Sequence, residues 1–567
     1  MSRQEAGCTQ LALAPHGLLS LVDELLLNII DHIDNQKALC LLATTCMRLQ
    51  DLAEPFIWRK LVVLSGNHAR NIATALDKRE ARIDFVKSLS VRYKDQNREG
   101  IEELNHFVGL MGKLKHLQLE SPCPNNSEWA EVFFDGYSRI DFTNLLAGAV
   151  YPRLGLPLAL PMLQSLTLHA HGPSDRKFLL GRAKAMFLST TLRNITLSCL
   201  NFEADMTHQD DMVVSKHRST PLRSLTLIEC NVNVQFLDVV LSLPKALKEL
   251  SIGERLHCFA DCVPSLDRKT RTSAPLFLTA LERQADSLQR LAHIGGTVQH
   301  LTARETDPRG AAKLRSLTSL AHLELGFESH LYYYLRQNGF PPALKTLKML
   351  DSAISLNAGQ DVRTMSSIAF RSITTLVTDH LSPAAIQPGF TIHLHFSDYS
   401  NLRLSVIAHP AEQNRLLSTL FLDRPAIYKI ATMLKSYRGH FHVSRDIFPS
   451  GTAYIPPYMY GEELPVENLM YDSDDYWRFN GINYQVVDDE ASRNELQGGK
   501  KLTACIECTA RDISATVCRS LANETPCWPC AISHMQCHWE DETDNAEEKE
   551  EEAGEGEDSD EYEDYVT

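Results

Sequence analysis

The 567-residue sequence contains no uninterrupted apolar run of the roughly 18 residues that a membrane-spanning helix needs. Its most apolar N-terminal stretch, from Leu11 to Ile30, is broken by His16, Asp23 and Glu24, so it does not fit a secretory signal either. With 44% hydrophobic and 23% charged residues, the chain is expected to be globular over most of its length, with two or more domains. We predict a protein of the cytoplasm or the nucleus, with no membrane partner.

A surplus of basic residues is also missing. The formal net charge is −16, but residues 540–567 hold sixteen acidic residues and one lysine, which leaves 56 acidic and 55 basic residues before them. Nucleic-acid binding depends largely on Lys and Arg contacts to phosphates. A neutral body with an acidic tail lacks this footprint, so we expect no nucleic-acid partner.

Sequence motifs of the common enzyme classes are absent. The chain has no phosphate-binding glycine loop, no nucleophile elbow and no carboxylate pair in a supporting context, so we predict that it is not an enzyme. Eight of its fourteen cysteines are scattered among apolar residues without the spacing of a disulfide framework. Such scattering is typical of reduced thiols in an intracellular protein.

The N-terminal region between Ser20 and Leu61 carries more apolar residues than one core can use. They follow two rows of helical spacing, so one row can fill a core while the other is left over. The rows run through Leu21, Leu25, Ile29 and Ile33 and through Val22, Leu26 and Ile30. A helical unit of about 45 residues buries too little surface to be secure alone, so we expect it to complete its core against a partner.

Local signals suggest where the helices of this unit begin. Ser20 and Asp23 predict a capping-box start, and Pro55 predicts the start of a last helical turn. Between them, further short helices are predicted by a second apolar series, Leu39, Leu42, Cys46, Leu49 and Leu52.

Residues 21–26, 29–30 and 55–61 resemble the F-box, the helical module of ubiquitin-ligase substrate receptors. Val22 replaces a usual proline, and the usual tryptophan after the central cysteine is replaced around Leu49. The resemblance implies an F-box at residues 16–62, after a flexible segment 1–15, that docks onto a Skp-type adaptor and through it onto a cullin. The implied adaptor-binding residues are Leu21, Val22, Leu25, Leu26, Ile29, Ile30, Leu42 and Trp58. The alternative is an ordinary amphipathic hairpin that caps the next domain.

From about residue 85 a Leu-x-x-Leu-x-Leu pattern recurs, and it places alternate side chains of a strand on one buried face. Most copies begin 24 to 32 residues apart. Amphipathic helices are predicted before several copies, at residues 101–111, 235–243 and 275–286. Clear copies begin at Leu114, Leu163, Leu192, Leu222, Leu247 and Leu320, and weaker ones at Val86, Leu288, Leu344 and Ile373.

This helix and strand phase resembles the leucine-rich repeat, which implies an α/β solenoid over residues 80–400. The family usually places Asn or Cys at the ninth position of a repeat, where it bonds the turn backbone. Here only Cys230 fits, so the repeats are irregular.

The exposed face of the predicted sheet is small and polar at its centre. The residue between the second and third apolar positions faces outward, and we predict client-binding residues there at Gln118, Thr167, Thr196, Thr226 and Ser251. A solvated strand face without a ligand is the alternative for each of them. His393, His395, His440 and His442 invite a metal interpretation, but the spacing fixes no acidic partner, so we favour contact with water.

Residues 401–450 are predicted to form helices that close the solenoid, over 411–421 and 427–437. Residues 451–500 are rich in Gly, Pro and aromatic residues and predict an irregular connection of unassigned role.

Residues 501–539 contain six cysteines within 33 residues, with paired CxxC spacing that predicts structural zinc. The predicted ligands are Cys505, Cys508, Cys518, Cys527, Cys530 and Cys537. The outer four suffice for one ion, and a reduced-thiol module without metal is the alternative. All six also resemble the fungal binuclear zinc cluster, but nine residues with only Arg511 separate Cys508 from Cys518, so DNA contact is not expected. The acidic residues 540–567 are predicted to be disordered.

The combined resemblances imply a non-catalytic substrate receptor of a cullin-type (SCF) ubiquitin ligase, in which the F-box binds the adaptor and the solenoid binds a client protein. The alternative is a zinc-cluster regulator of transcription whose acidic tail acts on the transcription machinery.

Overall fold

The computed structural model describes the N-terminal helices and most of the repeats. The described residues are 17–93, 97–120, 139–151, 157–169, 178–198, 200–254, 274–294, 309–326, 329, 331–337, 339–351, 373–381, 386–396, 424–447 and 466–473. The predictions for residues 1–15, for the helix at 411–421, for the cysteines of 501–539 and for the acidic tail all lie outside them. Within the described part, no helix is long and apolar enough to cross a membrane.

Three helices form a separate unit at the N-terminal end, α1 (Asp23–Asp31), α2 (Gln36–Ala43) and α3 (Met47–Arg59), preceded by the 3-10 turn η1 (Leu18–Ser20). Ile30, Leu39 and Ala53 are the fully buried centre of their small core. The predicted capping box is wrong, because Val22 occupies the N-cap position of α1 and the Ser20 hydroxyl bonds the carbonyl of Gly17. Asn35 caps α2 instead, accepting from the backbone N–H groups of Lys37 and Ala38.

Pro55 does not open a new turn, since α3 runs through it without a break. The proline therefore sits inside a 13-residue helix, where it removes one backbone donor. Packing of α3 against α1 and α2 on one side and against the repeats on the other holds the helix together.

The repeats build one twelve-stranded parallel sheet, in which each strand pairs with the strand of the next repeat. A last strand, β15 (Val466–Asp472), adds antiparallel to β14. Strands β5 (Phe178–Leu179) and β7 (Leu200–Phe202) form a small second ladder with the end of β8. The parallel strands are β1 (Lys60–Val63), β2 (Ser88–Arg92), β3 (His116–Glu120), β4 (Ser165–His169), β6 (Asn194–Ser198), β8 (Ser224–Val232), β9 (Glu249–Glu254), β10 (Arg290–Ile294), β11 (His322–Leu325), β12 (Thr346–Asp351), β13 (Thr391–Phe396) and β14 (His440–Ile447).

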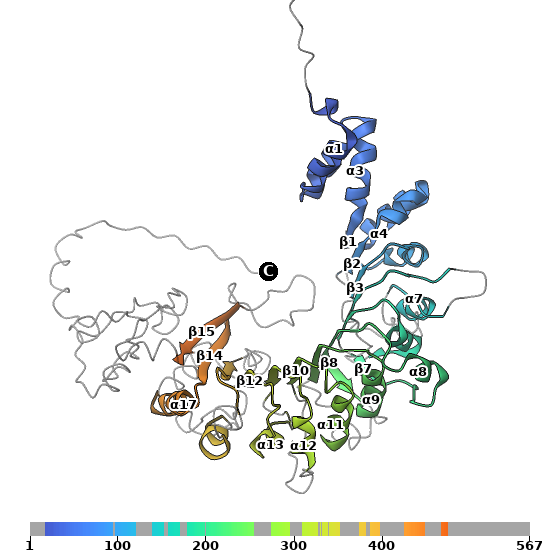
Figure 1. Ribbon diagram of the computed structural model, residues 1–567. Helices are drawn as coiled ribbons and strands as arrows, with labels where there is room; N and C mark the ends of the chain where they lie inside the picture. Colours follow the sequence, from blue (N-terminus) through green and yellow to red (C-terminus); the bar gives the residue numbers. More distant parts are fainter. Residues whose placement is uncertain are drawn as a thin grey trace, which may run out of the picture.

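The sheet lines the inner side of an arc, helices cover its outer side, and the N-terminal unit stands at one end (Figure 1). The helices of the arc are α4 (Gly66–Lys78), α5 (Asn105–Val108), α7 (Phe142–Gly148), α8 (Asp211–Lys216), α9 (Val234–Ser242), α11 (Ala274–Glu282), α12 (Arg309–Arg315), α13 (Leu331–Arg336) and α17 (Arg424–Ser436). Shorter turns are η2 (Glu80–Phe85), η4 (Ile101–Leu104), η6 (Gly181–Leu188) and the π-helical η8 (Leu376–His380). This arrangement, a twelve-stranded parallel sheet alternating with helices, confirms the α/β class that we predicted.

Strict register explains why the leucine pattern works. Leu117 pairs with Leu166, which pairs with Ile195, so equivalent apolar residues stack from repeat to repeat on the buried face. Each is 1–2% exposed, and burial of one such side chain contributes about 1.5–3 kcal/mol. Cys230 is fully buried and its thiol bonds the carbonyl of Ile228 at 3.3 Å, as expected for the turn position. The side chain of Asn231 donates to that of Asn201 in the preceding repeat at 2.7 Å, a contact between repeats that the sequence pattern did not reveal.

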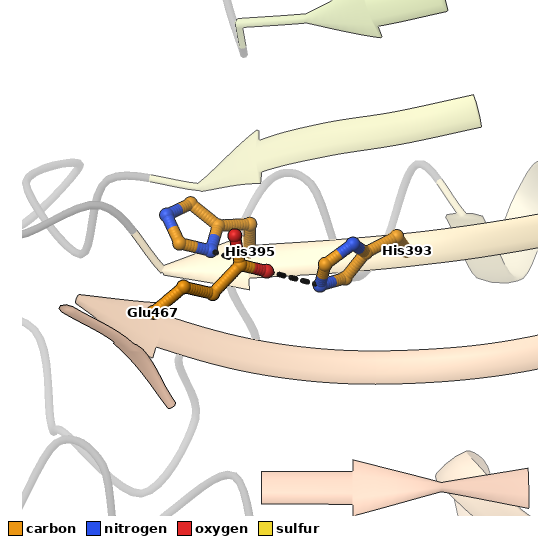
Figure 2. A group of neighbouring side chains, drawn as sticks. All are labelled: His393, His395 and Glu467. Atoms are coloured by element: carbon orange, nitrogen blue, oxygen red, sulfur yellow. Dashed lines mark ion pairs between the residues drawn. The ribbon is translucent and has the colours of Figure 1, made fainter. Parts of the chain in front are cut away.

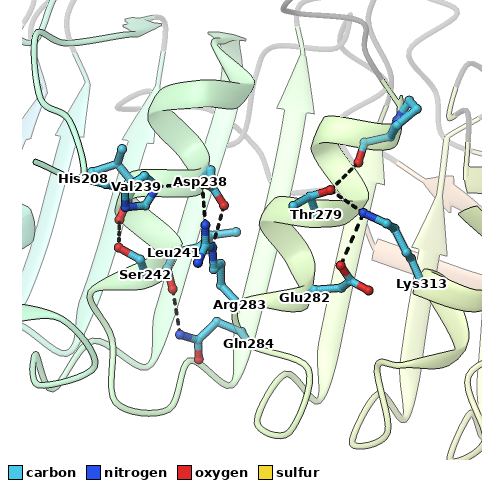
Figure 3. A network of polar contacts seen from close by, with 11 residues as sticks. His208, Asp238, Val239, Leu241, Ser242, Thr279, Glu282, Arg283, Gln284 and Lys313 are labelled. Atoms are coloured by element: carbon cyan, nitrogen blue, oxygen red, sulfur yellow. Dashed lines mark hydrogen bonds and ion pairs between the residues drawn. The ribbon is translucent and has the colours of Figure 1, made fainter.

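Polar contacts link neighbouring outer helices (Figure 3). Asp238 of α9 accepts from Arg283, which follows α11, at 2.8 and 3.0 Å and lies 2.7 Å from His208. Burial alone would raise the pKa of the Asp238 carboxyl, but hydrogen bonds from Arg283 and His208 outweigh it and lower the pKa. The side-chain amide of Gln284 donates to the backbone carbonyls of Leu241 and Pro244. The segment after α11 is therefore bonded to the end of α9 and to the residues that follow it.

Three expectations for the C-terminal half need correction. Ile373 and Leu376 are buried helical residues, not a strand, and the strand of that repeat is β13. The sheet also continues past residue 400, where we expected the repeats to end, because β14 pairs in parallel with β13. Residues 466–472, predicted to be irregular, form β15. The alternation of apolar and polar residues in β13 is a stronger strand signal than the short apolar pair at Ile373.

Candidate functional site

The N-terminal unit exposes a row of apolar side chains. Val22 is 57% exposed, Leu25 49% and Ile29 43%, and their spacing along α1 places them on one face. Leu21 is half-buried beside them. Monomeric proteins rarely leave so many large apolar groups together in water, so this row has the character of an interaction surface.

Four of the eight predicted adaptor-binding residues do not lie on this row. Leu26 and Ile30 are 1% exposed in the unit's own core, which makes them unable to contact a partner. Leu42 packs against the same core, and Trp58 packs against the core of the repeats. Leu26 and Ile30 of the second row therefore fill the core, Ile33 of the first row packs against it, and Val22, Leu25 and Ile29 are left exposed.

Three further apolar side chains adjoin the row without having been predicted. Leu18 and Leu19 are about half exposed, and Met47 at the start of α3 is 80% exposed. Arg48, the next residue, ties the start of α3 to this region, since it donates to the carbonyls of Leu19 and Leu21 and to the Asp23 carboxylate at 2.6–2.9 Å. These side chains lie outside the helical periodicity of α1, which is the signal that we followed in the sequence. We define the docking row as Leu18, Leu19, Val22, Leu25, Ile29 and Met47.

The unit is joined to the repeats through a buried carboxylate. Glu54 of α3 is 4% exposed and accepts from Arg82 Nε at 2.6 Å, and it forms a second ion pair with Arg79. The Arg82 guanidinium also lies 5.1 Å from the centre of the Trp58 ring. These contacts fix the docking row relative to the sheet.

The outward residues of the sheet form a second candidate surface. Gln118, Thr167, Thr196, Thr226 and Ser251 stand directly opposite one another on adjacent strands, in one unbroken register. All five are half-buried. The row continues through Ala292, Glu324, Lys348 and His393 to His442.

The predicted histidines meet acidic partners from β15 at the far end of the sheet (Figure 2). The Ser444 hydroxyl lies 2.6 Å from His393 Nε2, 2.8 Å from His395 Nδ1 and 2.7 Å from Glu467 Oε1. Lys348 donates to the other oxygen of Glu467 at 3.1 Å. His395 is 4% exposed, so the expectation that these histidines simply meet water is wrong for it.

Burial and charge set the protonation of this cluster. Burial is the main reason that the pKa of His393 falls to about 4, helped by the nearby cations and opposed by Glu467. Burial would raise the pKa of Glu467, but bonds from Ser444 and Lys348 lower it. His393 is therefore neutral and Glu467 charged at neutral pH.

The potential ligand atoms of His393, His395 and Glu467 lie within 4.8 Å of one another, close enough to be compared with a metal site. Ser444 Oγ already stands between them, however, and one arrangement of protons satisfies every contact. Both histidines donate to the hydroxyl, which donates to Glu467. The cluster thus works as a hydrogen-bonded junction of β13, β14 and β15.

Comparisons with known proteins supply no further guide, since no protein-family model matches the chain and no curated protein matches it. Function must therefore be inferred from the two surfaces.

Proposed function

We propose that this protein is the substrate receptor of a cullin-type ubiquitin ligase. Its N-terminal unit docks onto a Skp-type adaptor, and its sheet face binds a client protein. The ubiquitin chemistry belongs to other subunits, so no residue of this chain is catalytic. The observation that carries the proposal is the docking row, a set of exposed apolar side chains on a helical unit that is too small to bury them itself.

The layout supports two simultaneous contacts. The docking row is held on the repeats by Glu54, Arg79 and Arg82, so an adaptor bound to it has a fixed position relative to the sheet. A fixed geometry suits a receptor that must present a client to an enzyme bound elsewhere in the complex. The polar outward row from Gln118 to Ser251 suits a hydrated protein interface, which is typically rich in polar contacts.

The test is to charge the docking row in the full chain. Leu25→Asp together with Ile29→Asp should reduce capture by a purified Skp-type adaptor at least about 100-fold, because two carboxylates cannot be desolvated in an apolar interface at less than several kcal/mol. Both side chains are exposed, so the folded chain tolerates the change.

A matched control is available in α8. Met212→Asp with Val214→Asp adds the same two charges to exposed apolar positions on the repeats, and adaptor capture should be unchanged. Equal capture of the wild type and the Leu25/Ile29 variant would show that the docking row does not bind an adaptor. Zinc analysis of the same preparations tests the predicted cysteine site separately. One ion per chain would favour a site of the outer four cysteines, two would favour a binuclear cluster of all six, and none would favour the reduced-thiol module.

A further inference from the structure

The topology gathers basic residues that are dispersed in the sequence onto one edge of the sheet. Six of them immediately precede strands, so they recur at the same place in successive repeats, and a seventh is the first residue of β10. We call this set the basic rim: Lys87, Lys115, Arg193, Arg223, Lys248, Arg290 and Lys345.

Backbone hydrogen bonds align the rim residues. The N–H of Lys115 bonds the carbonyl of Lys87 at 2.8 Å, Arg223 bonds Arg193 at 2.7 Å, and Lys248 bonds Arg223 at 2.8 Å. The ladder continues through neighbouring residues to Lys345, across nine strands that are about 4.8 Å apart. The rim is thus about 40 Å long.

Among the described residues, six of the seven rim cations have no carboxylate within ion-pair distance. Within the described residues, only Arg290 is near one, 3.8 Å from Glu249 across an exposed pair. Some basic side chains elsewhere do have a carboxylate partner, for example Arg283 with Asp238 and Lys313 with Glu282. The positive character of the rim also contributes to the lowered pKa of His322, for which burial is the first cause and Arg290 and Lys345 are the next.

The alignment works against folding. Arg193, Arg223 and Lys248 immediately precede three adjacent strands, and like charges placed side by side in this way repel one another. An anionic partner lying along the rim would remove this repulsion. The cationic groups of the basic rim are therefore suited to bind an extended polyanion.

We propose that the basic rim binds the acidic segment 540–567 of the same chain. That segment has sixteen acidic residues and one lysine, a charge opposite to the rim's. The 66 residues between Ser473, the last described residue, and Glu540 reach at most about 220–240 Å, several times the length of the rim. The tether therefore allows the contact, and covalent linkage gives the segment a high effective concentration. The contact needs no fold in the segment, because charge attraction alone carries it.

Nucleic acid is the less suitable polyanion. The outward residues of the described strands β2–β12 that flank the rim include no Phe, Tyr or Trp on which bases could stack. Because the acidic segment is covalently attached, it would also compete with a nucleic acid for binding to the rim. Its occupation of the rim would screen the adjoining outward row, where the proposed client binds, although the proposal does not depend on the client.

The test uses the full chain and a zero-length carbodiimide cross-linker that joins carboxylates to lysines. At low salt, peptides from residues 540–567 should be linked preferentially to Lys87, Lys115, Lys248 and Lys345. At about 1 M salt, where charges are screened beyond roughly 3 Å, these links should fall at least about fivefold.

Two arginine substitutions separate attraction from chemistry. Arg193→Gln with Arg223→Gln leaves every lysine available, yet links at Lys115 and Lys248 should fall about threefold or more as two exposed charge contacts are lost. Arg70→Gln with Arg315→Gln removes the same charge from exposed positions of α4 and α12 and should leave them unchanged.

Links spread evenly over exposed lysines of the outer helices, or unaffected by the rim variant, would overturn the proposal. So would a rim without tail links that binds a labelled oligonucleotide or an added acidic peptide in a manner weakened by Arg193→Gln and Arg223→Gln.

Discussion

The N-terminal helical unit and the repeats use their apolar residues in opposite ways. In the repeats, apolar side chains of the strands face the outer helices and are almost completely buried, while the open face of the sheet is polar at its centre. In the helical unit, one apolar row is buried and the other is exposed at Val22, Leu25 and Ile29. A solenoid covers each strand with its own helix and its neighbours, whereas three short helices have no second layer.

This difference separates two kinds of candidate surface. Exposed apolar groups have a cost in water, so their presence at the N-terminal end argues for a partner even before that partner is known. Exposing the polar outward row to water has no such free-energy cost, so the row is stable without a partner. The role of the outward row as a client surface therefore depends on the receptor proposal. The docking row indicates a binding partner independently of that proposal.

The junction between the two regions should show the largest effect. Glu54→Ala leaves Arg79 and Arg82 without their buried counter-ion, so we expect the chain to lose about 3–5 kcal/mol of unfolding free energy. Asp51→Ala, which removes an exposed pair with the same Arg79 at 3.6 Å, should cost less than about 1 kcal/mol. Denaturant melts of the two variants measure the difference, and equal losses would mean that the buried Glu54 pairs contribute no more to stability than the exposed Asp51 pair.

The two rows of α1 give the next contrast. Leu26→Ala opens a cavity in the small helical core and should cost about 2–5 kcal/mol, whereas Leu25→Ala, one residue away, should change stability by less than about 0.5 kcal/mol. Adaptor capture should respond in the reverse sense, with Leu25→Ala the more harmful once the fraction of folded protein is taken into account. A larger stability loss at Leu25 would contradict the assignment of rows.

The sequence predicted the sheet well because each repeat carries the same Leu-x-x-Leu-x-Leu spacing. Leu117, Leu166 and Ile195 occupy one register position, and any one of them locates the strand. It predicted which residues of α1 are apolar but not which row is buried, because α2 and α3 decide that choice through packing. The acidic partner of His393, Glu467, comes from β15, more than seventy residues away, so no local spacing could reveal it.

A pH effect should distinguish the C-terminal end of the sheet from its centre. An unfolded histidine titrates near pH 6.5, while His393 in the folded chain has a pKa of about 4. Between these values the unfolded chain binds the proton and the folded chain does not, so stability falls as pH decreases. From pH 7 to pH 5 this group should remove roughly 1–2 kcal/mol. His393→Gln should flatten that part of the curve, and an unchanged slope would assign the dependence to other groups.

The smallest effect is expected at the outward row itself. Thr226 lies next to Leu225 in β8, but it faces the open side of the sheet and leaves no cavity when shortened. Thr226→Ala should therefore cost less than about 1 kcal/mol, a loss set mainly by strand propensity and cross-strand contacts with Thr196 and Ser251. Leu225→Ala, its buried neighbour, should cost about 2–5 kcal/mol. Thermal unfolding of both variants measures the contrast.

Because Thr226→Ala leaves the fold intact, any loss of client capture in this variant can be attributed to the surface, and a large loss of stability would show that this face is not open.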